Sequence, residues 1–236
     1  MKKLTMLLAL GATMALMPTV SKATIVGSTH DFSPSGEFAS VTNGLARFKW
    51  GGETNYYNNP CQVCHIPHKS QAYATAHAPL WNHKLSANNY QTYDQAGSAT
   101  FNALGLSVSL GSSVACLSCH DGSVAINQTA GYSGTATNSL SGQAVFAPSF
   151  AVEAIGGTDL TKMHPIGVSY ASAVAVDSEL KPVTGIMNKM LKGTTKNLEC
   201  ASCHDIHQTI GASATVSHDL IVDLEGGQLC LTCHNK

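Results

Sequence analysis

The stretch Cys61-Gln62-Val63-Cys64-His65 sets the pattern for the whole chain, because the spacing Cys-x-x-Cys-His recurs three more times. The other copies are Cys116-Leu117-Ser118-Cys119-His120, Cys200-Ala201-Ser202-Cys203-His204 and Cys230-Leu231-Thr232-Cys233-His234. Together the four copies use all 8 cysteines of the 236-residue chain. This repetition indicates one type of site that is built four times.

The motif is the attachment signature of c-type haem. Two thiols at this spacing can each form a thioether with a porphyrin vinyl group, while the adjacent imidazole binds the iron as proximal ligand. We therefore expect four covalently bound haem c groups. The expected thioether positions are Cys61, Cys64, Cys116, Cys119, Cys200, Cys203, Cys230 and Cys233. The expected proximal ligands are His65, His120, His204 and His234.

Cysteine pairs at this spacing also occur in zinc half-sites, in redox motifs and in disulfide frameworks. None of these alternatives explains why a histidine follows every pair. Haem attachment explains all four histidines at once, and we take it as the primary interpretation.

The amino terminus has the pattern of an export signal. Two lysines precede an apolar run over residues 4–20, and the small residues of Ser21-Lys22-Ala23 follow. The run is short for a membrane span, which needs about 20 apolar residues. We expect residues 1–23 to be a cleaved signal peptide and the mature chain, from Thr24, to contain no membrane span. Secretion through the periplasm to the cell surface or extracellular space also suits haem c, which is attached outside the cytoplasmic membrane.

The composition limits the type of fold. Charged residues make up 11% of the chain, against roughly 25% in typical soluble domains, and large aliphatic residues are sparse. Four porphyrins would supply apolar plates around which such a chain can fold. The sequence therefore predicts a multihaem cytochrome c fold, mostly irregular, with short α-helices and little sheet. No linker divides the chain, and we expect residues 24–236 to form one tetrahaem domain.

The charge balance argues against nucleic acid as a partner. The chain has 13 Lys and Arg against 14 Asp and Glu, and loss of the three leader lysines would leave 10 basic residues. No basic patch of the kind that contacts phosphates is present. A surface with so few charges is also poorly protected against self-association.

Histidines outnumber the remaining need for iron ligands. Beyond the four proximal positions the chain has His30, His68, His77, His83, His164, His207 and His218. His68 and His207 each lie three residues after a proximal histidine, and a helical turn would put both rings on one side. Each must then serve a different haem from its neighbour's. The first and third motifs share this extension, which leaves open whether a two-haem unit was duplicated.

Four further residues are candidates for distal ligation. His164 lies in Met163-His164-Pro165-Ile166-Gly167, where proline and glycine can hold a rigid turn. His30 has Asp31 beside it as a carboxylate that could orient its ring, and on these grounds it is no better a candidate than His83. Thioether ligation by Met163 would raise the potential, but imidazoles are in surplus.

Several segments resemble the OmcE-type tetrahaem cytochromes, which form extracellular filaments known as nanowires. They are His30-Asp31-Phe32-Ser33, C-H-I-P-H, Pro-Leu-Trp-Asn, C-L-S-C-H-D-G-S-V-A, His-Pro-Ile, C-A-S-C-H-D-I-H and C-L-T-C-H-N-K. The resemblance implies distal ligands at His30, His68, His164 and His207. It leaves out His83, whose position is variably basic in the family, and Ile206 replaces a usual proline. It also implies a homopolymer in which an axial histidine can come from the neighbouring subunit.

An iron with two axial histidines has no open position for a substrate, so electron transfer is the expected function and the chain is not expected to be an enzyme. The primary hypothesis is extracellular electron transfer along a conductive filament, from redox partners at the cell surface to extracellular acceptors. The alternative is a soluble or outer-surface monomeric tetrahaem shuttle. A reductase would need an open iron, and a quinol dehydrogenase would keep its amino-terminal anchor.

Overall fold

The computed structural model describes residues 25–26, 28, 30–31, 60–61, 64–68, 79–96, 99–124, 157–207 and 219–235. All four cysteine pairs and their adjacent histidines fall within these ranges. The expected signal peptide, its cleavage position, His77 and His218 lie outside the described residues.

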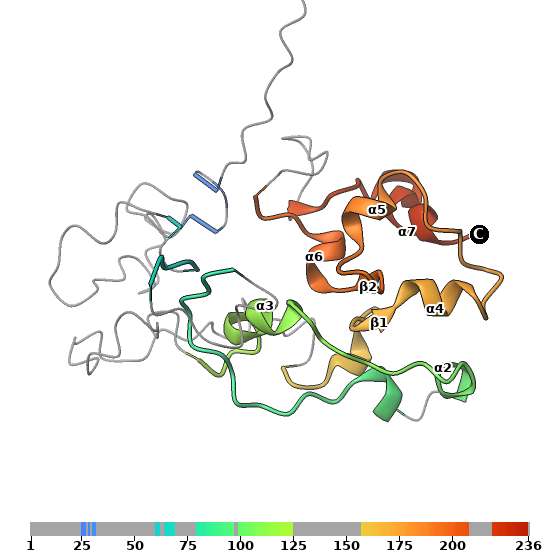
Figure 1. Cartoon of the computed structure of the whole chain (residues 1–236), viewed down its shortest axis with the longest axis horizontal. Coiled ribbons are helices and arrows are strands. Elements are labelled where there is room, and N and C mark those ends of the chain that lie inside the picture. The colour runs from blue at the N-terminus through green and yellow to red at the C-terminus, as the bar shows by residue number, and fades with distance from the viewer. Residues whose placement is uncertain are drawn as a thin grey trace, which may run out of the picture.

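The described elements are short and are joined by irregular backbone (Figure 1). The α-helices are α2 (Ala99–Ala103), α3 (Ser113–His120), α4 (Tyr170–Val174), α5 (Met187–Met190), α6 (Cys200–Cys203) and α7 (Gln228–Cys233). Single 3-10 turns are η3 (Tyr93–Gln95), η4 (Leu160–Lys162) and η6 (Glu225–Gly227). Strands β1 (Val168–Ser169) and β2 (Asn197–Leu198) pair antiparallel. Within the described ranges, no helix has the length and apolar character needed to cross a membrane.

Helix α3 is the longest of these helices, and it carries the whole second motif. The helix is followed by Gly122, whose φ of 72° is the left-handed conformation that closes many helices. The Gly122 amide donates to the Cys119 carbonyl over 3.2 Å. The motif histidine, His120, therefore occupies the last helical position.

A buried carboxylate joins the start of α3 to the start of α6. Glu199 is 5% exposed, and its carboxylate accepts the Ser112 backbone N–H over 2.8 Å as well as the Ser112 hydroxyl. In return, the Cys200 amide donates to the Ser113 hydroxyl over 3.0 Å. Glu199 also forms a capping box with Ser202 at the start of α6. These contacts fix the second motif beside the third.

The turn that carries His164 is held against the chain at residues 108–109. Gly167 has a φ of 78°, and its carbonyl accepts the Ser109 amide over 2.7 Å. A Cβ at Gly167 would lie 2.8 Å from Val108 Cγ1 and 2.9 Å from the Ser109 carbonyl oxygen. Only glycine fits both the conformation and the space, so the turn is fixed before β1 begins.

The described core is divided into three small apolar clusters rather than one. Each cluster includes one motif cysteine. Cys64 packs with the buried Trp81 and Ala115. Cys200 packs with the buried Leu117, Leu160 and Ile166, and Cys233 packs with the buried Tyr170, Met187 and Leu191. Because Cys64, Cys200 and Cys233 pack against these clusters, their motifs are part of the packed framework.

Gly111 offers a test of the junction between α3 and α6. It has a φ of 54°, and a Cβ there would overlap the Glu199 carboxylate. Gly111→Ala should therefore lower the free energy of unfolding in two ways, by a steric cost of about 1–3 kcal/mol and by a backbone cost of about 1–2 kcal/mol. The free energy of unfolding, measured by urea titration, reports the sum.

Gly105→Ala is the matched control, since Gly105 has a φ of 62° and nothing within 4 Å of the added carbon. Its free energy of unfolding should fall only by the backbone cost. Equal losses in the two variants would mean that the Glu199 contact is not required for stability.

Candidate functional site

Each motif closes one helical turn from its first cysteine to its histidine. The histidine amide donates to the first cysteine's carbonyl over 2.8 Å in the first motif, 3.1 Å in the third and 2.9 Å in the fourth, and the second motif lies within α3. Residues at positions i, i+3 and i+4 share one face of a helix. Both sulfurs and the imidazole of a motif are therefore presented on the same side.

The first motif faces the end of the third. The ring centroids of His65 and His207 are 6.2 Å apart, with an angle of 36° between the ring planes. His65 Nδ1–H donates to the Pro79 carbonyl oxygen over 2.7 Å. In a neutral imidazole this leaves the Nε2 lone pair available to a metal. His207 had been expected to serve a haem other than its own motif's, and it lies beside the histidine of the first.

The second motif faces the amino-terminal segment. The ring centroids of His30 and His120 are 6.0 Å apart at an interplanar angle of 49°. Burial, and then the proximity of His30, lowers the pKa of His120 to about 4. Burial is also the main cause that lowers the pKa of His30. Both rings are therefore neutral at pH 7, as metal ligation requires.

A carboxylate distant in the sequence, that of Asp219, contacts the His30 ring, a role for which the sequence suggests Asp31. His30 Nδ1 lies 3.3 Å from Asp219 Oδ2, an arrangement of the kind that orients a ligating imidazole and leaves Nε2 available to a metal. Asp219 has a φ of 55°, a conformation in which aspartate is enriched. Its segment pairs with the third motif, since the Asp205 amide donates to the Asp219 carbonyl over 2.7 Å.

The fourth motif faces the turn that Gly167 stabilises. The ring centroids of His164 and His234 are 6.3 Å apart, with the ring planes at 69°. His164 Nδ1–H donates to the Pro165 carbonyl oxygen over 3.0 Å. As with His65, this bond leaves Nε2 as the available lone pair.

The three ring separations fit one metal atom held between two imidazoles. A ligating imidazole nitrogen lies about 2.0 Å from a metal, and the ring centre lies about 1.1 Å farther, so two opposed ligands place their ring centres about 6.2 Å apart. Ordinary aromatic pairs span about 4.5–7 Å, so one pair alone would carry little weight. Here three pairs fall between 6.0 and 6.3 Å, and each joins a motif histidine to a distal candidate.

His204 of the third motif and the candidate His68 belong to none of these three pairs, and both are exposed. The expectation that His68 is a distal ligand stays a prediction, and its position at the surface leaves it accessible to another molecule. The Asp205 carboxylate caps the turn after His204 by accepting the His207 amide over 3.1 Å.

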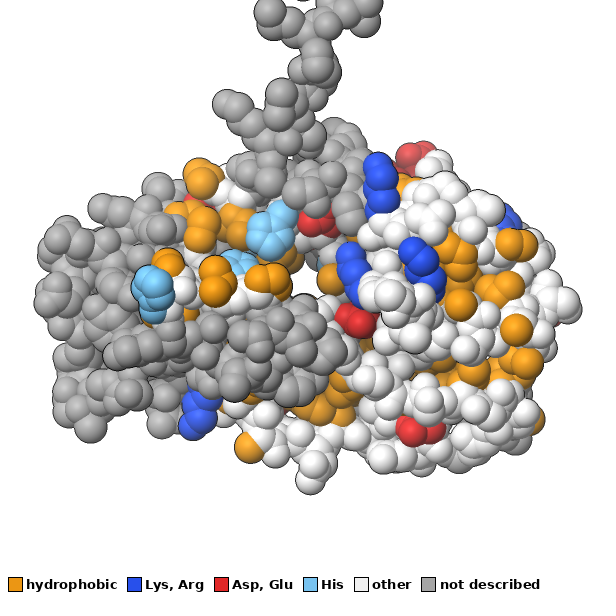
Figure 2. Space-filling view, in the orientation of Figure 1, with side chains coloured by type: hydrophobic (Ala, Val, Ile, Leu, Met, Phe, Trp, Pro, Cys, Tyr) orange, Lys and Arg blue, Asp and Glu red, His pale blue; other side chains and the backbone are white. Residues whose placement is uncertain are grey.

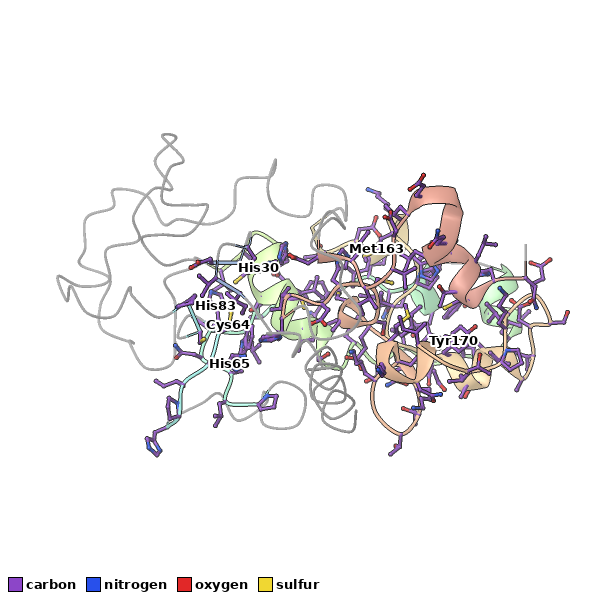
Figure 3. All side chains as sticks on the ribbon, turned by 90° about the horizontal axis from the view of Figure 1, so that it is seen from above. His30, Cys64, His65, His83, Met163 and Tyr170 are labelled. Atoms are coloured by element: carbon purple, nitrogen blue, oxygen red, sulfur yellow. The ribbon has the colours of Figure 1, made fainter. Side chains whose placement is uncertain are left out.

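Two other candidates have different surroundings. His83 is fully buried, and its Nε2 lies 3.5 Å from Cys119 Sγ. Met163 packs in the cluster of Leu117 and Leu160. Figure 3 shows His83 beside Cys64 and His65, with Met163 in the other half of the molecule.

Cysteines of consecutive motifs lie close enough to affect one another electrostatically. Burial and then Cys64 raise the pKa of Cys119, and a hydrogen bond with Cys200, together with burial, raises that of Cys116. Burial and then Cys233 raise the pKa of Cys203 to about 11. The four sites are therefore contiguous in the order of the sequence, and these three thiols are protonated at neutral pH.

The first site also holds a buried donor that the described protein atoms do not satisfy. Trp81 is 8% exposed, its ring lies edge-on to His65 at 6.1 Å, and its indole N–H has no acceptor among the described residues. Such a group usually has a partner, and a haem propionate is an acceptor of the right chemistry. Figure 2 shows histidine side chains among hydrophobic ones on the face of the molecule that it presents.

Sequence reasoning missed several contributors to these sites. Pro79 and Pro165 act through backbone carbonyls, which have no sequence signal of their own. Asp219 is far from His30 in the chain, and its role depends on the pairing of its segment with the third motif. Trp81 lies in the Pro-Leu-Trp-Asn segment noted above, where the signal was present but had no assigned role.

Two of the alternative roles of the cysteines, a disulfide framework and a zinc site, find no counterpart in the described residues. None of the eight cysteines is in a disulfide. No group of three or more His, Cys, Asp or Glu side chains within the described ranges is arranged to hold a metal ion among them. The chain matches no protein-family model and no curated protein with which it was compared.

Proposed function

We propose that this protein is a tetrahaem c-type cytochrome that transfers electrons outside the cell and assembles into a conductive filament. The observation that carries the proposal is the set of three imidazole pairs, each with the separation of two axial ligands of one iron. The four Cys-x-x-Cys-His turns add the covalent attachment points.

The pairs assign ligands to three haems. His65 and His207 would hold the haem at Cys61 and Cys64, His120 and His30 the one at Cys116 and Cys119, and His234 and His164 the one at Cys230 and Cys233. His204 and His68 remain for the haem at Cys200 and Cys203. When bound, haem supplies a one-electron iron couple whose potential depends on its axial ligands and surroundings.

The chain's own residues favour electron transfer over catalysis at iron. Two axial histidines leave no coordination position for a substrate, so the proposed protein is not an enzyme. The hydrogen bonds of His65, His30 and His164 through Nδ1 hold each ring in place, which limits reorganisation when the charge changes. Contiguous sites shorten the gaps that electrons must tunnel across, so four sites in sequence order act as a relay.

The filament proposal rests on the resemblance to OmcE-type cytochromes, on the low charge of the chain and on the exposure of His68 and His204. An exposed histidine such as His68 could serve as an axial ligand in a neighbouring subunit. Secretion to the cell surface or beyond, with mineral, electrode or cell-surface redox partners, follows from the same resemblance and from the export signal.

The first test is electron microscopy of the purified secreted protein together with its haem content. We expect filaments with four haems per subunit and a low-spin spectrum for every haem. Dispersed particles carrying four haems would overturn the filament and leave the monomeric shuttle. A chain that carries no haem after expression in a host that attaches haem c would overturn the whole proposal.

His164→Ala tests one ligand pair. Removal of the distal imidazole should convert one haem in four to a high-spin or water-ligated state, while the thioethers at Cys230 and Cys233 stay intact. Optical and electron paramagnetic resonance spectra measure the change. Met163→Leu is the matched control, because it conserves volume in the Leu117 cluster at a cost below about 1.5 kcal/mol and should leave every haem low-spin.

His68→Ala tests the fourth pair. It should leave haem attachment complete but convert one haem to high spin, and it should shorten or abolish filaments if His68 acts across a subunit interface. Microscopy and spectra of the same sample separate the two effects. An unchanged low-spin spectrum would show that His68 is not an axial ligand.

A further inference from the structure

A buried carboxylate lies between the second and third motifs, and the proposed iron ligands do not involve it. Glu199 is 5% exposed and directly precedes Cys200, the first cysteine of the third motif. Its Oε2 atom accepts the backbone N–H and the hydroxyl of Ser112, one helical turn before Cys116 of the second motif. One acidic side chain is therefore held next to two expected haem attachment points.

The chain makes room for this carboxylate. Gly111 has a φ of 54°, and a Cβ there would overlap the carboxylate of Glu199, so the position favours glycine. The N–H and O–H of Ser112 are the donors that an ionised carboxylate accepts. A buried charge needs such compensation, because removing it from water is unfavourable.

The nearby cation compensates the carboxylate only from a distance. Burial lowers the pKa of Lys192, while the charges of Asp205 and then Glu199 raise it. Lys192 and Glu199 nevertheless form no ion pair within the described part of the chain. Because no cation contacts the carboxylate directly, its charge acts on other groups in the surrounding low-dielectric interior.

We propose that the charge of Glu199 lowers the reduction potential of the haem at the third motif and, to a smaller extent, that of the haem at the second. This inference rests on the proposed function. The ferric form of a haem carries one more positive charge than the ferrous form, so a nearby buried anion favours the ferric form. Since Cys200 would be bonded to the third porphyrin, the adjacent Glu199 stays close to it. The carboxylate thus disfavours an electron resting on the middle of the relay.

Two substitutions separate the charge of Glu199 from its hydrogen bonds. Glu199→Gln removes the charge but keeps the size of the side chain and an oxygen that can accept the Ser112 N–H. Glu199→Asp keeps the charge but shortens the side chain, which disturbs the bonds to Ser112. Glu225→Gln is the matched control, because it removes a charge from an exposed position in η6, where water and salt screen it.

The readout is the set of haem midpoint potentials, measured by redox titration of the holoprotein with optical and electron paramagnetic resonance spectra. The variants His207→Ala, His30→Ala and His164→Ala should each remove one haem from the low-spin set, which assigns the signals of the first, second and fourth haems. The remaining signal belongs to the third.

In Glu199→Gln we expect the reduced-to-oxidised ratio of the third haem to increase about tenfold at a fixed potential, an upward shift of about 59 mV for a one-electron couple. A unit charge about 12 Å away has this effect at an effective dielectric constant of about 20. The second haem should shift upward by less, and the first and fourth should shift least. Glu199→Asp and Glu225→Gln should leave all four potentials close to those of the unmodified chain.

Other outcomes would overturn the inference. Unchanged potentials in Glu199→Gln would mean that the charge does not influence the irons. Equal shifts in Glu199→Gln and Glu199→Asp would assign the effect to the bonds with Ser112, and a Glu199→Gln chain without its four haems would assign the carboxylate to the stability of the junction. If the unmodified chain carries four low-spin haems, any of these results leaves the proposed function standing, whereas an unmodified chain without haem overturns both.

Discussion

The hydrogen bond from each motif histidine to the carbonyl of its first cysteine is the constraint on which the sites depend. It closes a single helical turn, and that turn puts two sulfurs and one imidazole on the same face. Helix α6 spans only Cys200–Cys203, and α7 begins two residues before Cys230 and ends at Cys233. The secondary structure of these regions is therefore largely the geometry of the motif itself.

Contacts between motifs, and not one large core, position these turns relative to one another. Glu199 joins α3 to α6 through Ser112. The Tyr170 hydroxyl donates to carbonyls at both Lys181 and Cys233, each over 2.9 Å, and so fixes α7. Specific polar bonds of this kind suit a chain with little apolar volume, because each fixes a distance and a direction.

The electrostatic setting of the histidines is consistent with the proposed ligation. Burial lowers the pKa values of His30 and His120, and neutral rings are the form that binds iron. The charge of Asp219 opposes this shift at His30 without exceeding it, so its carboxylate orients the ring without protonating it. The same carboxylate would increase the basicity of the ring as a ligand.

The sequence alone determined where the four motifs lie and which side chains each presents, because a one-turn geometry depends only on residues four positions apart. It also selected His30, His164 and His207 as ligand candidates, in part through the family resemblance. It did not determine which rings meet, since His65 and His207, or His30 and His120, come from distant segments. Nor did it distinguish His30 from His83 on physical grounds. Tertiary packing made that distinction by placing one ring against an imidazole and the other against a cysteine sulfur, and no local pattern encodes which neighbour a buried ring will have.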